Sequence, residues 1–159
     1  MELKYLVHIY FVISLIGIGI LGLFIGLNEK KLTGKKEIST KDAPAAIGPY
    51  SQAIFAGNYL FVSGQIAIPP DGAINNNDTA AGQARQALAN IRAILEEANL
   101  DFSNVVKATV LFKDLSDFGE VNKVYEEFFP SPYPARAAFE VSALPKDAKV
   151  EIEVIAIKD

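Results

Sequence analysis

A long apolar run at the N-terminus restricts how this chain can fold more than any other feature. Residues 6–27 read LVHIYFVISLIGIGILGLFIGL, which is 22 residues without a formal charge. A helix that crosses the hydrocarbon core of a bilayer needs about 20 such residues. The alternative is a cleaved signal peptide, whose apolar region is usually about 7–15 residues long and follows a basic leader. Because this run is longer and only Lys4 precedes it as a basic side chain, we expect an uncleaved transmembrane helix within residues 1–27.

The residues that follow the apolar run predict an orientation and the domain boundaries. Four lysines come soon after it, namely Lys30, Lys31, Lys35 and Lys36. Positively charged flanks tend to stay on the cytoplasmic side of a membrane. We therefore expect the rest of the chain to be anchored at the membrane on its cytoplasmic side, or to be exported if the leader is a signal peptide. Residues 28–40 are predicted to be a polar tether, and residues 41–159 have the usual length of one compact domain.

The composition of this domain excludes several kinds of chemistry. From Glu37 onward there are ten basic and seventeen acidic residues, a net charge of −7 without a Lys/Arg cluster, so we expect no nucleic-acid partner. The chain has no cysteine, and its one histidine, His8, lies in the leader. The domain therefore has no disulfide, thiolate nucleophile or imidazole base, and we expect no metal site. Its chemistry must use Arg, Glu, Tyr, hydroxyl and backbone groups.

The order of strand and helix patterns in residues 41–159 predicts an α+β fold. Two prolines and a Gly-Pro pair make residues 43–51 a loop. Apolar stripes at helical spacing predict one helix from Asp78 or Thr79 to about Ala98, and another over residues 115–128. Runs rich in β-branched residues predict strands over residues 59–63, 105–112, 136–141 and 149–157. This order favours a mixed β-sheet with both helices packed on one face.

The last two predicted strands indicate where their polar side chains point. In VEIEVIAI, residues 150–157, all even positions are apolar and are expected to face the helices. In the preceding strand the apolar set is Ala137, Phe139 and Val141. Arg136 and Glu151 are therefore predicted to lie on the same, helix-free face. Aliphatic residues share that face, which leaves two interpretations: a wetted outer sheet face, or a subunit interface that contains a polar pocket.

An ordered series of short motifs extends over residues 41–159. It consists of AAIGPYSQ at 45–52, SGQ at 63–65, ARQ at 84–86, Asn90, Lys107, DL at 114–115, VN at 121–122, Tyr125, PAR at 134–136, LPKD at 144–147 and EIE at 151–153. A single piece such as SGQ is a weak signal, but the ordered set is specific. On these motifs the domain strongly resembles the Rid (YjgF-like) family of reactive intermediate deaminases, in its RidA branch. The leader takes no part in the resemblance.

The resemblance implies a fold, an assembly and a reaction. Family members have a chorismate-mutase-like α+β fold and form homotrimers with a pocket at each subunit interface. They hydrolyse 2-imino and enamine acids, of the 2-aminoacrylate and 2-iminobutanoate type, to 2-keto acids and ammonia. No cofactor or metal takes part. The resemblance thus implies a hydrolase of the 2-iminobutanoate/2-iminopropanoate deaminase type.

The resemblance also assigns catalytic roles to three residues. Arg136 would hold the substrate carboxylate, Glu151 would position or activate water, and Tyr50 completes the set. From the residues alone, an arginine at the start of a strand is more often a surface ion-pair partner. By strand parity, Glu153 would serve as well as Glu151. These assignments therefore depend on the resemblance.

Four further positions would form the substrate-binding site together with Arg136. Ser63, Gly64 and Asn122 would line the pocket, and Ala138 would contribute its backbone. Many relatives have cysteine where this chain has Ala138. The difference should matter little if only the backbone is used.

Two other functions remain open at this point. A non-catalytic trimer would use the same pocket to bind small carboxylates. A ribonuclease or translation inhibitor, as some relatives have been described, is disfavoured by the net charge of −7 and by the lack of a histidine in the domain.

Overall fold

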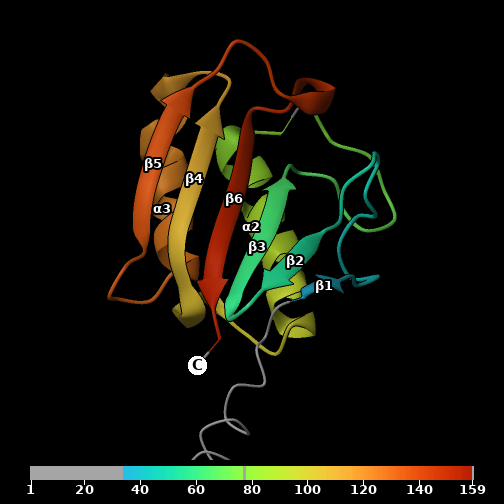
Figure 1. Ribbon diagram of the computed structural model, residues 1–159. Helices are drawn as coiled ribbons and strands as arrows, with labels where there is room; N and C mark the ends of the chain where they lie inside the picture. The colour runs from blue at the N-terminus through green and yellow to red at the C-terminus, as the bar shows by residue number, and fades with distance from the viewer. Residues whose placement is uncertain (1–33, 77, 159) are drawn as a thin grey trace, which may run out of the picture. The chain divides into compact units, whose positions relative to one another are not determined.

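The computed structural model describes residues 34–76 and 78–158. They form a six-stranded sheet in the order β1-β2-β3-β6-β4-β5 (Figure 1). The strands are β1 (Lys35–Ile38), β2 (Ala53–Ala56), β3 (Tyr59–Gln65), β4 (Val105–Phe112), β5 (Ala135–Glu140) and β6 (Val150–Ile157). Neighbouring strands are antiparallel except for β4 and β5, which are parallel. The sheet is therefore mixed, as predicted.

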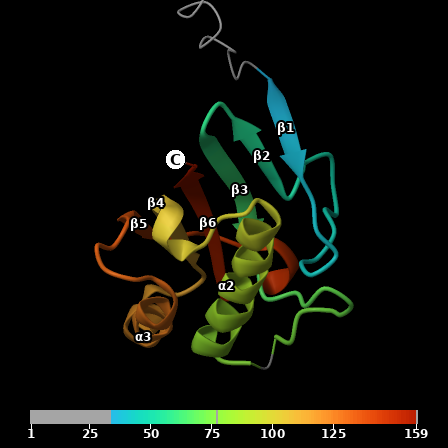
Figure 2. The same ribbon diagram turned by 90° about the horizontal axis from the view of Figure 1, so that it is seen from below.

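Two helices lie on one face of this sheet, α2 (Ala80–Glu97) and α3 (Phe118–Phe128) (Figure 2). Thr79 caps α2, because its side-chain oxygen accepts a hydrogen bond of 3.0 Å from the Gly82 N–H. Short 3-10 turns occupy Phe102–Asn104, Leu115–Asp117 and Pro145–Asp147. The α+β fold with a mixed sheet and two helices is confirmed.

The main core lies between the helices and the sheet face that they cover. All four apolar residues at even positions of β6 are buried, as the alternation predicted: Val150, Ile152, Val154 and Ala156. Each is paired with a buried residue of β4, in the order Phe112, Val110, Ala108 and Val105. Full burial of a large aliphatic side chain stabilises a fold by about 1.5–3 kcal/mol. The sheet face that carries these residues is therefore the face covered by the helices.

The structure adds two strands that were not expected. β1 lies inside the segment predicted to be a polar tether, and it pairs with β2 through Lys36–Phe55 and Ile38–Ala53. Only Ile38 of β1 is buried, so the strand is held mainly by backbone pairing, which leaves little hydrophobic pattern to detect. β2 is four residues long and directly precedes the turn at Gly57. It is too short to show a clear alternation.

The predicted direction of the β5 side chains is wrong. Arg136 and Ala138 pair with Ala108 and Val110 of β4, whose side chains are buried under the helices. Paired residues of neighbouring strands point to the same side of a sheet, so Arg136 and Ala138 lie on the helix side. Phe139 points to the open face and is 54% exposed. In this edge strand, the apolar side chains therefore did not indicate which side the helices cover.

The predicted membrane span, residues 1–27, lies outside the described residues. Within residues 34–76 and 78–158, no helix is both long enough and apolar enough to cross a bilayer. The longer helix, α2, has 18 residues and carries charged side chains at Arg85, Arg92, Glu96 and Glu97. The prediction of a membrane-anchored location is contradicted by this finding. The described residues form an α+β domain whose two helices pack on a sheet.

The loop between β1 and β2 is held by one buried amide, Gln52, which is 3% exposed. Its side-chain oxygen accepts a hydrogen bond of 2.7 Å from the Thr40 N–H. Its side-chain nitrogen donates to the carbonyl oxygens of Thr40, Ala43 and Pro44, at 3.1, 3.2 and 2.9 Å. Gln52 therefore satisfies backbone groups that have no strand partner here, and it holds residues 40–44 beside the start of β2.

We expect Gln52→Ala to lower the free energy of unfolding by about 1–3 kcal/mol, because buried backbone groups lose their partner. Urea unfolding measures the change, and amide hydrogen exchange at Thr40 should become faster. Gln86→Ala is a matched control, since among the described residues the Gln86 side chain makes one hydrogen bond, to the Asn90 side chain at 2.9 Å, and none to the backbone. An equal loss of stability in both variants would contradict the role given to Gln52.

Candidate functional site

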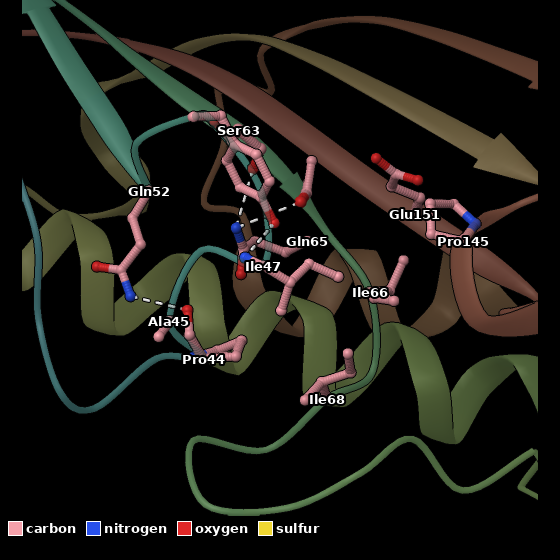
Figure 3. Close-up of a pocket in the computed structure, with 12 residues that line it drawn as sticks. Pro44, Ala45, Ile47, Gln52, Ser63, Gln65, Ile66, Ile68, Pro145 and Glu151 are labelled. Atoms are coloured by element: carbon pink, nitrogen blue, oxygen red, sulfur yellow. Dashed lines mark hydrogen bonds between the residues drawn. The ribbon is translucent and has the colours of Figure 1, made fainter.

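Four of the predicted site residues meet in one pocket, called here the β3–β6 pocket. Tyr50, Ser63, Gly64 and Glu151 line this cavity of about 310 Å³. The remaining lining residues are Pro44, Ala45, Ile47, Gln52, Gln65, Ile66, Ile68 and Pro145. Figure 3 shows the lining side chains, with Gln52 directed at the loop of Pro44 and Ala45. The pocket thus combines a polar side with a wall of aliphatic residues.

An irregularity in the sheet brings β3 close to the Glu151 carboxylate. The register between β3 and β6 shifts between Val62 and Gln65, so Ser63 and Gly64 lie in a bulge. A Cβ atom at Gly64 would overlap a carboxylate oxygen of Glu151. Because Gly64 has no Cβ atom, the Glu151 carboxylate can occupy this space.

The half-buried position of Glu151 changes its acidity. Burial raises the pKa of its carboxyl above the ordinary value, and the charge of Glu153 raises the pKa further. A carboxyl with a raised pKa keeps its proton to higher pH, and once ionised it is a stronger base than an ordinary carboxylate. Glu153 is exposed and does not line the pocket, so the structure distinguishes two residues that strand parity left equivalent.

Two hydroxyl groups of the pocket are oriented by backbone contacts. Ser63 Oγ donates a hydrogen bond of 2.7 Å to the Ser51 carbonyl, which leaves the oxygen lone pairs available to a ligand. Tyr50 Oη accepts a hydrogen bond of 3.3 Å from the Ile47 N–H. The Tyr50 hydroxyl proton is then available to an acceptor, and the side chain is 48% exposed.

The other three predicted site residues lie elsewhere, around β5 and α3. Arg136 and Asn122 line a second cavity of about 260 Å³, called here the α3–β5 hollow, together with Tyr125, Glu126, Tyr133 and Pro134. Ala138 lines a narrow gap between β4, β5 and α3, which Arg136 and Asn122 also border. Asn122 donates from its side-chain nitrogen to Glu126 Oε1, at 3.3 Å. The structure therefore divides the predicted site into two groups.

The two groups lie on opposite faces of the sheet. Glu151 is paired with Leu111, and that row continues to Phe139 on the open face. Arg136 belongs to the row of Ala108 and Val154 on the helix side. Strand β4 lies between β5 and β6, so Arg136 and Glu151 are also two strands apart. One copy of the chain does not bring these two side chains together.

Aromatic rings, rather than acids, contact the Arg136 guanidinium. Its Cζ lies 4.6 Å from the centre of the Tyr125 ring and 5.4 Å from that of Phe118. The ion pairs found among the described residues, Arg85–Glu127 and Lys113–Asp147, do not include Arg136. The interpretation of Arg136 as an ion-pair partner therefore finds no support in residues 34–76 and 78–158.

Sequence reasoning did not assign a role to Gln52 or Tyr125, although both lie in the recognised motifs. Their contacts depend on tertiary packing, which a short motif does not describe. For metals, the described part of the chain contains no group of three Asp, Glu or His side chains placed to hold an ion.

Comparisons with known proteins agree with the fold and with the motifs. The family described as Endoribonuclease L-PSP matches residues 40–158. The RutC family protein y4sK of Sinorhizobium fredii is 57% identical over 118 residues, which are 74% of this chain and 94% of that protein. The 2-iminobutanoate/2-iminopropanoate deaminase of Bos taurus is 52% identical over 124 residues, covering 78% of this chain and 90% of the bovine protein.

A solved structure is also similar to this chain in both fold and sequence. The crystal structure of E. coli TdcF with bound serine has a TM-score of 0.73 and 42% identity, and the match covers 78% of this chain and 99% of that chain. The family match covers well over half of the chain, and the relatives share about half of its residues over most of their own length. The chain therefore belongs to the Endoribonuclease L-PSP, or Rid, family.

Proposed function

We propose that this protein is an imine deaminase that hydrolyses small 2-imino acids to 2-keto acids and ammonia. The observation that carries the proposal is the pair of half-sites: an arginine without an ion-pair partner among the described residues, and a pocket with a half-buried glutamate. Relatives with about half of their residues identical are named 2-iminobutanoate/2-iminopropanoate deaminase. The serine bound to TdcF has the α-carboxylate and α-nitrogen of such substrates.

The proposed active site is completed by a second copy of the chain, in a homotrimer. Arg136 of one copy then faces the β3–β6 pocket of its neighbour. The open sheet face supports such an assembly, because Tyr59, Phe61 and Phe139 are 48%, 45% and 54% exposed on it. A large exposed apolar patch usually marks an interface, and copies of one chain usually assemble with closed symmetry.

The chemistry needs little beyond orientation and proton transfer. The planar guanidinium of Arg136 binds both oxygens of the substrate carboxylate. Water adds to the electrophilic imine carbon and forms a carbinolamine. The C–N bond then breaks, the nitrogen leaves as ammonia, and the C–O bond becomes the keto carbonyl. The Glu151 carboxylate takes a proton from the attacking water and passes it to the imine nitrogen, which gives the carbinolamine. It then takes the hydroxyl proton and delivers it to the amino group, so that ammonia leaves as the carbonyl forms. The raised pKa makes this carboxylate a stronger base than an ordinary one.

Binding without catalysis and RNA cleavage are the competing functions. A binding protein would need Arg136 but not the Glu151 carboxyl, so Glu151→Gln separates binding from turnover. A ribonuclease is not favoured, because His8 is the only histidine and the chain from Glu37 onward has a net charge of −7.

Mixed assemblies test both the reaction and the shared site. We expect Arg136→Ala and Glu151→Gln to be inactive singly when keto-acid release from 2-iminobutanoate is measured. Random mixing of the two in a trimer leaves about a quarter of the sites with both native residues, so activity should return to about that fraction. Mixtures that stay inactive, although the two proteins exchange subunits, would contradict a site shared between copies. Full activity of either single variant would contradict the proposed reaction.

Gly64→Ala tests the space around the Glu151 carboxylate. The added methyl group displaces the carboxylate, and we expect kcat/KM to fall roughly 10–100-fold because catalytic groups tolerate little misplacement. The control is Gly119→Ala, since nothing lies within 4 Å of a Cβ atom built there. That substitution lies within α3 and should stabilise it by up to about 1 kcal/mol, without loss of activity. Equal activity of the two variants would refute the steric argument.

Glu151 should also make stability depend on pH. The pKa of its carboxyl is higher in the folded protein than in the unfolded chain. Between the two values the folded state binds more protons, so the free energy of unfolding falls as pH rises through this window. Glu151→Gln removes this dependence. We therefore expect the stability of the variant relative to the wild type to increase from about pH 4 to about pH 7, in urea unfolding at fixed protein concentration. A constant difference across this range would contradict the raised pKa.

A further inference from the structure

Aromatic rings hold the guanidinium of Arg136, the group proposed to bind the substrate carboxylate. Its guanidinium lies over the Tyr125 ring at 4.6 Å and near the Phe118 ring at 5.4 Å. Both aromatic residues come from α3, at its first and eighth positions. A cation is attracted to the face of an aromatic ring within about 6 Å of the centroid. An acidic partner would also hold the arginine, but it would neutralise the charge and occupy N–H donors that a ligand needs.

The Tyr125 ring is itself firmly held. Tyr125 is 4% exposed, and its ring is stacked on that of Phe129 with centroids 3.9 Å apart and planes inclined by 14°. Phe102 contacts Phe129 edge-on, with ring centroids 4.7 Å apart, and so packs against this stack. The ring under Arg136 is therefore the end of a packed aromatic column and not a mobile surface side chain.

The Tyr125 hydroxyl does not account for this arrangement. It is buried and has no hydrogen-bond partner among the described residues. Burial raises the pKa of Tyr125 to about 12, although the charge of Arg136 acts in the opposite direction. The hydroxyl is therefore neutral at physiological pH, and its burial without a partner is a cost to the fold. What Tyr125 offers Arg136 is the face of its ring.

We propose that Tyr125 is the positioning residue of Arg136: its ring holds the plane of the guanidinium and leaves the N–H donors free for a carboxylate. The inference rests on the proposed role of Arg136 in binding the substrate. It assigns to α3 a part in substrate recognition, through the aromatic face under the cation. Phe118 is a second, more distant contact of the same guanidinium.

Three variants test the role of the ring. Tyr125→Leu keeps an apolar side chain but removes the aromatic face, and we expect an approximately tenfold rise in KM and in the Kd for 2-ketobutanoate, with kcat changed less. Tyr125→Phe keeps the ring and should restore both constants to within about twofold, with stability equal to or above that of the wild type. Val124→Ala, at another buried position of α3, should lower the melting temperature without changing KM or Kd.

The outcomes separate this inference from the proposed function. If the wild type is active and Tyr125→Leu leaves KM and Kd unchanged, the inference is overturned and the proposed function stands. The inference also fails if Val124→Ala raises KM as much as Tyr125→Leu, because the effect would then follow general stability. Failure of Tyr125→Phe to restore binding would show that the hydroxyl, not the ring, is needed. If the wild type binds the keto acid but does not hydrolyse an imine, the proposed reaction is overturned. The Kd values of the wild type and of Tyr125→Leu then still test the role of Tyr125.

Discussion

Burial of one face of the sheet under α2 and α3 determines the position of every other feature of the domain. Residues of β4 and β6 alternate so that one set fills the core and the other faces outward. Because the side-chain period of a strand is two, a slip of one residue would exchange these sets. The same register therefore fixes Glu151 on the open face and Arg136 on the covered face.

The two half-sites are built by different means. In the β3–β6 pocket, a bulge and a glycine make room for the Glu151 carboxylate, and Gln52 holds the loop that carries Tyr50. In the α3–β5 hollow, a helix presents aromatic rings to an arginine on the edge strand. Neither half contains the groups of the other, so under the proposed function the reaction depends on assembly of the chain with itself.

The order of helices and strands was predictable because long amphipathic patterns cover α2, α3, β4 and β6. β1 and β2 were missed, since four-residue strands carry too little pattern. The side-chain direction of β5 was mispredicted because Phe139 is apolar yet faces outward, whereas the helix side accepts Arg136 by contact with aromatic rings. The residues of the candidate site came from motif order. Their division into two groups depends on register, which the motifs do not describe.

The division of the site has a consequence for how substrate preference can change. The arginine, its aromatic support and the asparagine all come from one continuous stretch, residues 118–138, whereas the aliphatic wall comes from residues 44–68 and Pro145. Under the proposed function, substitutions in the wall would alter the room for the substrate's side chain without changing the group that binds its carboxylate. Under the proposed function the two properties can therefore diverge independently, and a lineage could acquire a new imino acid as substrate while the carboxylate-binding group stays the same.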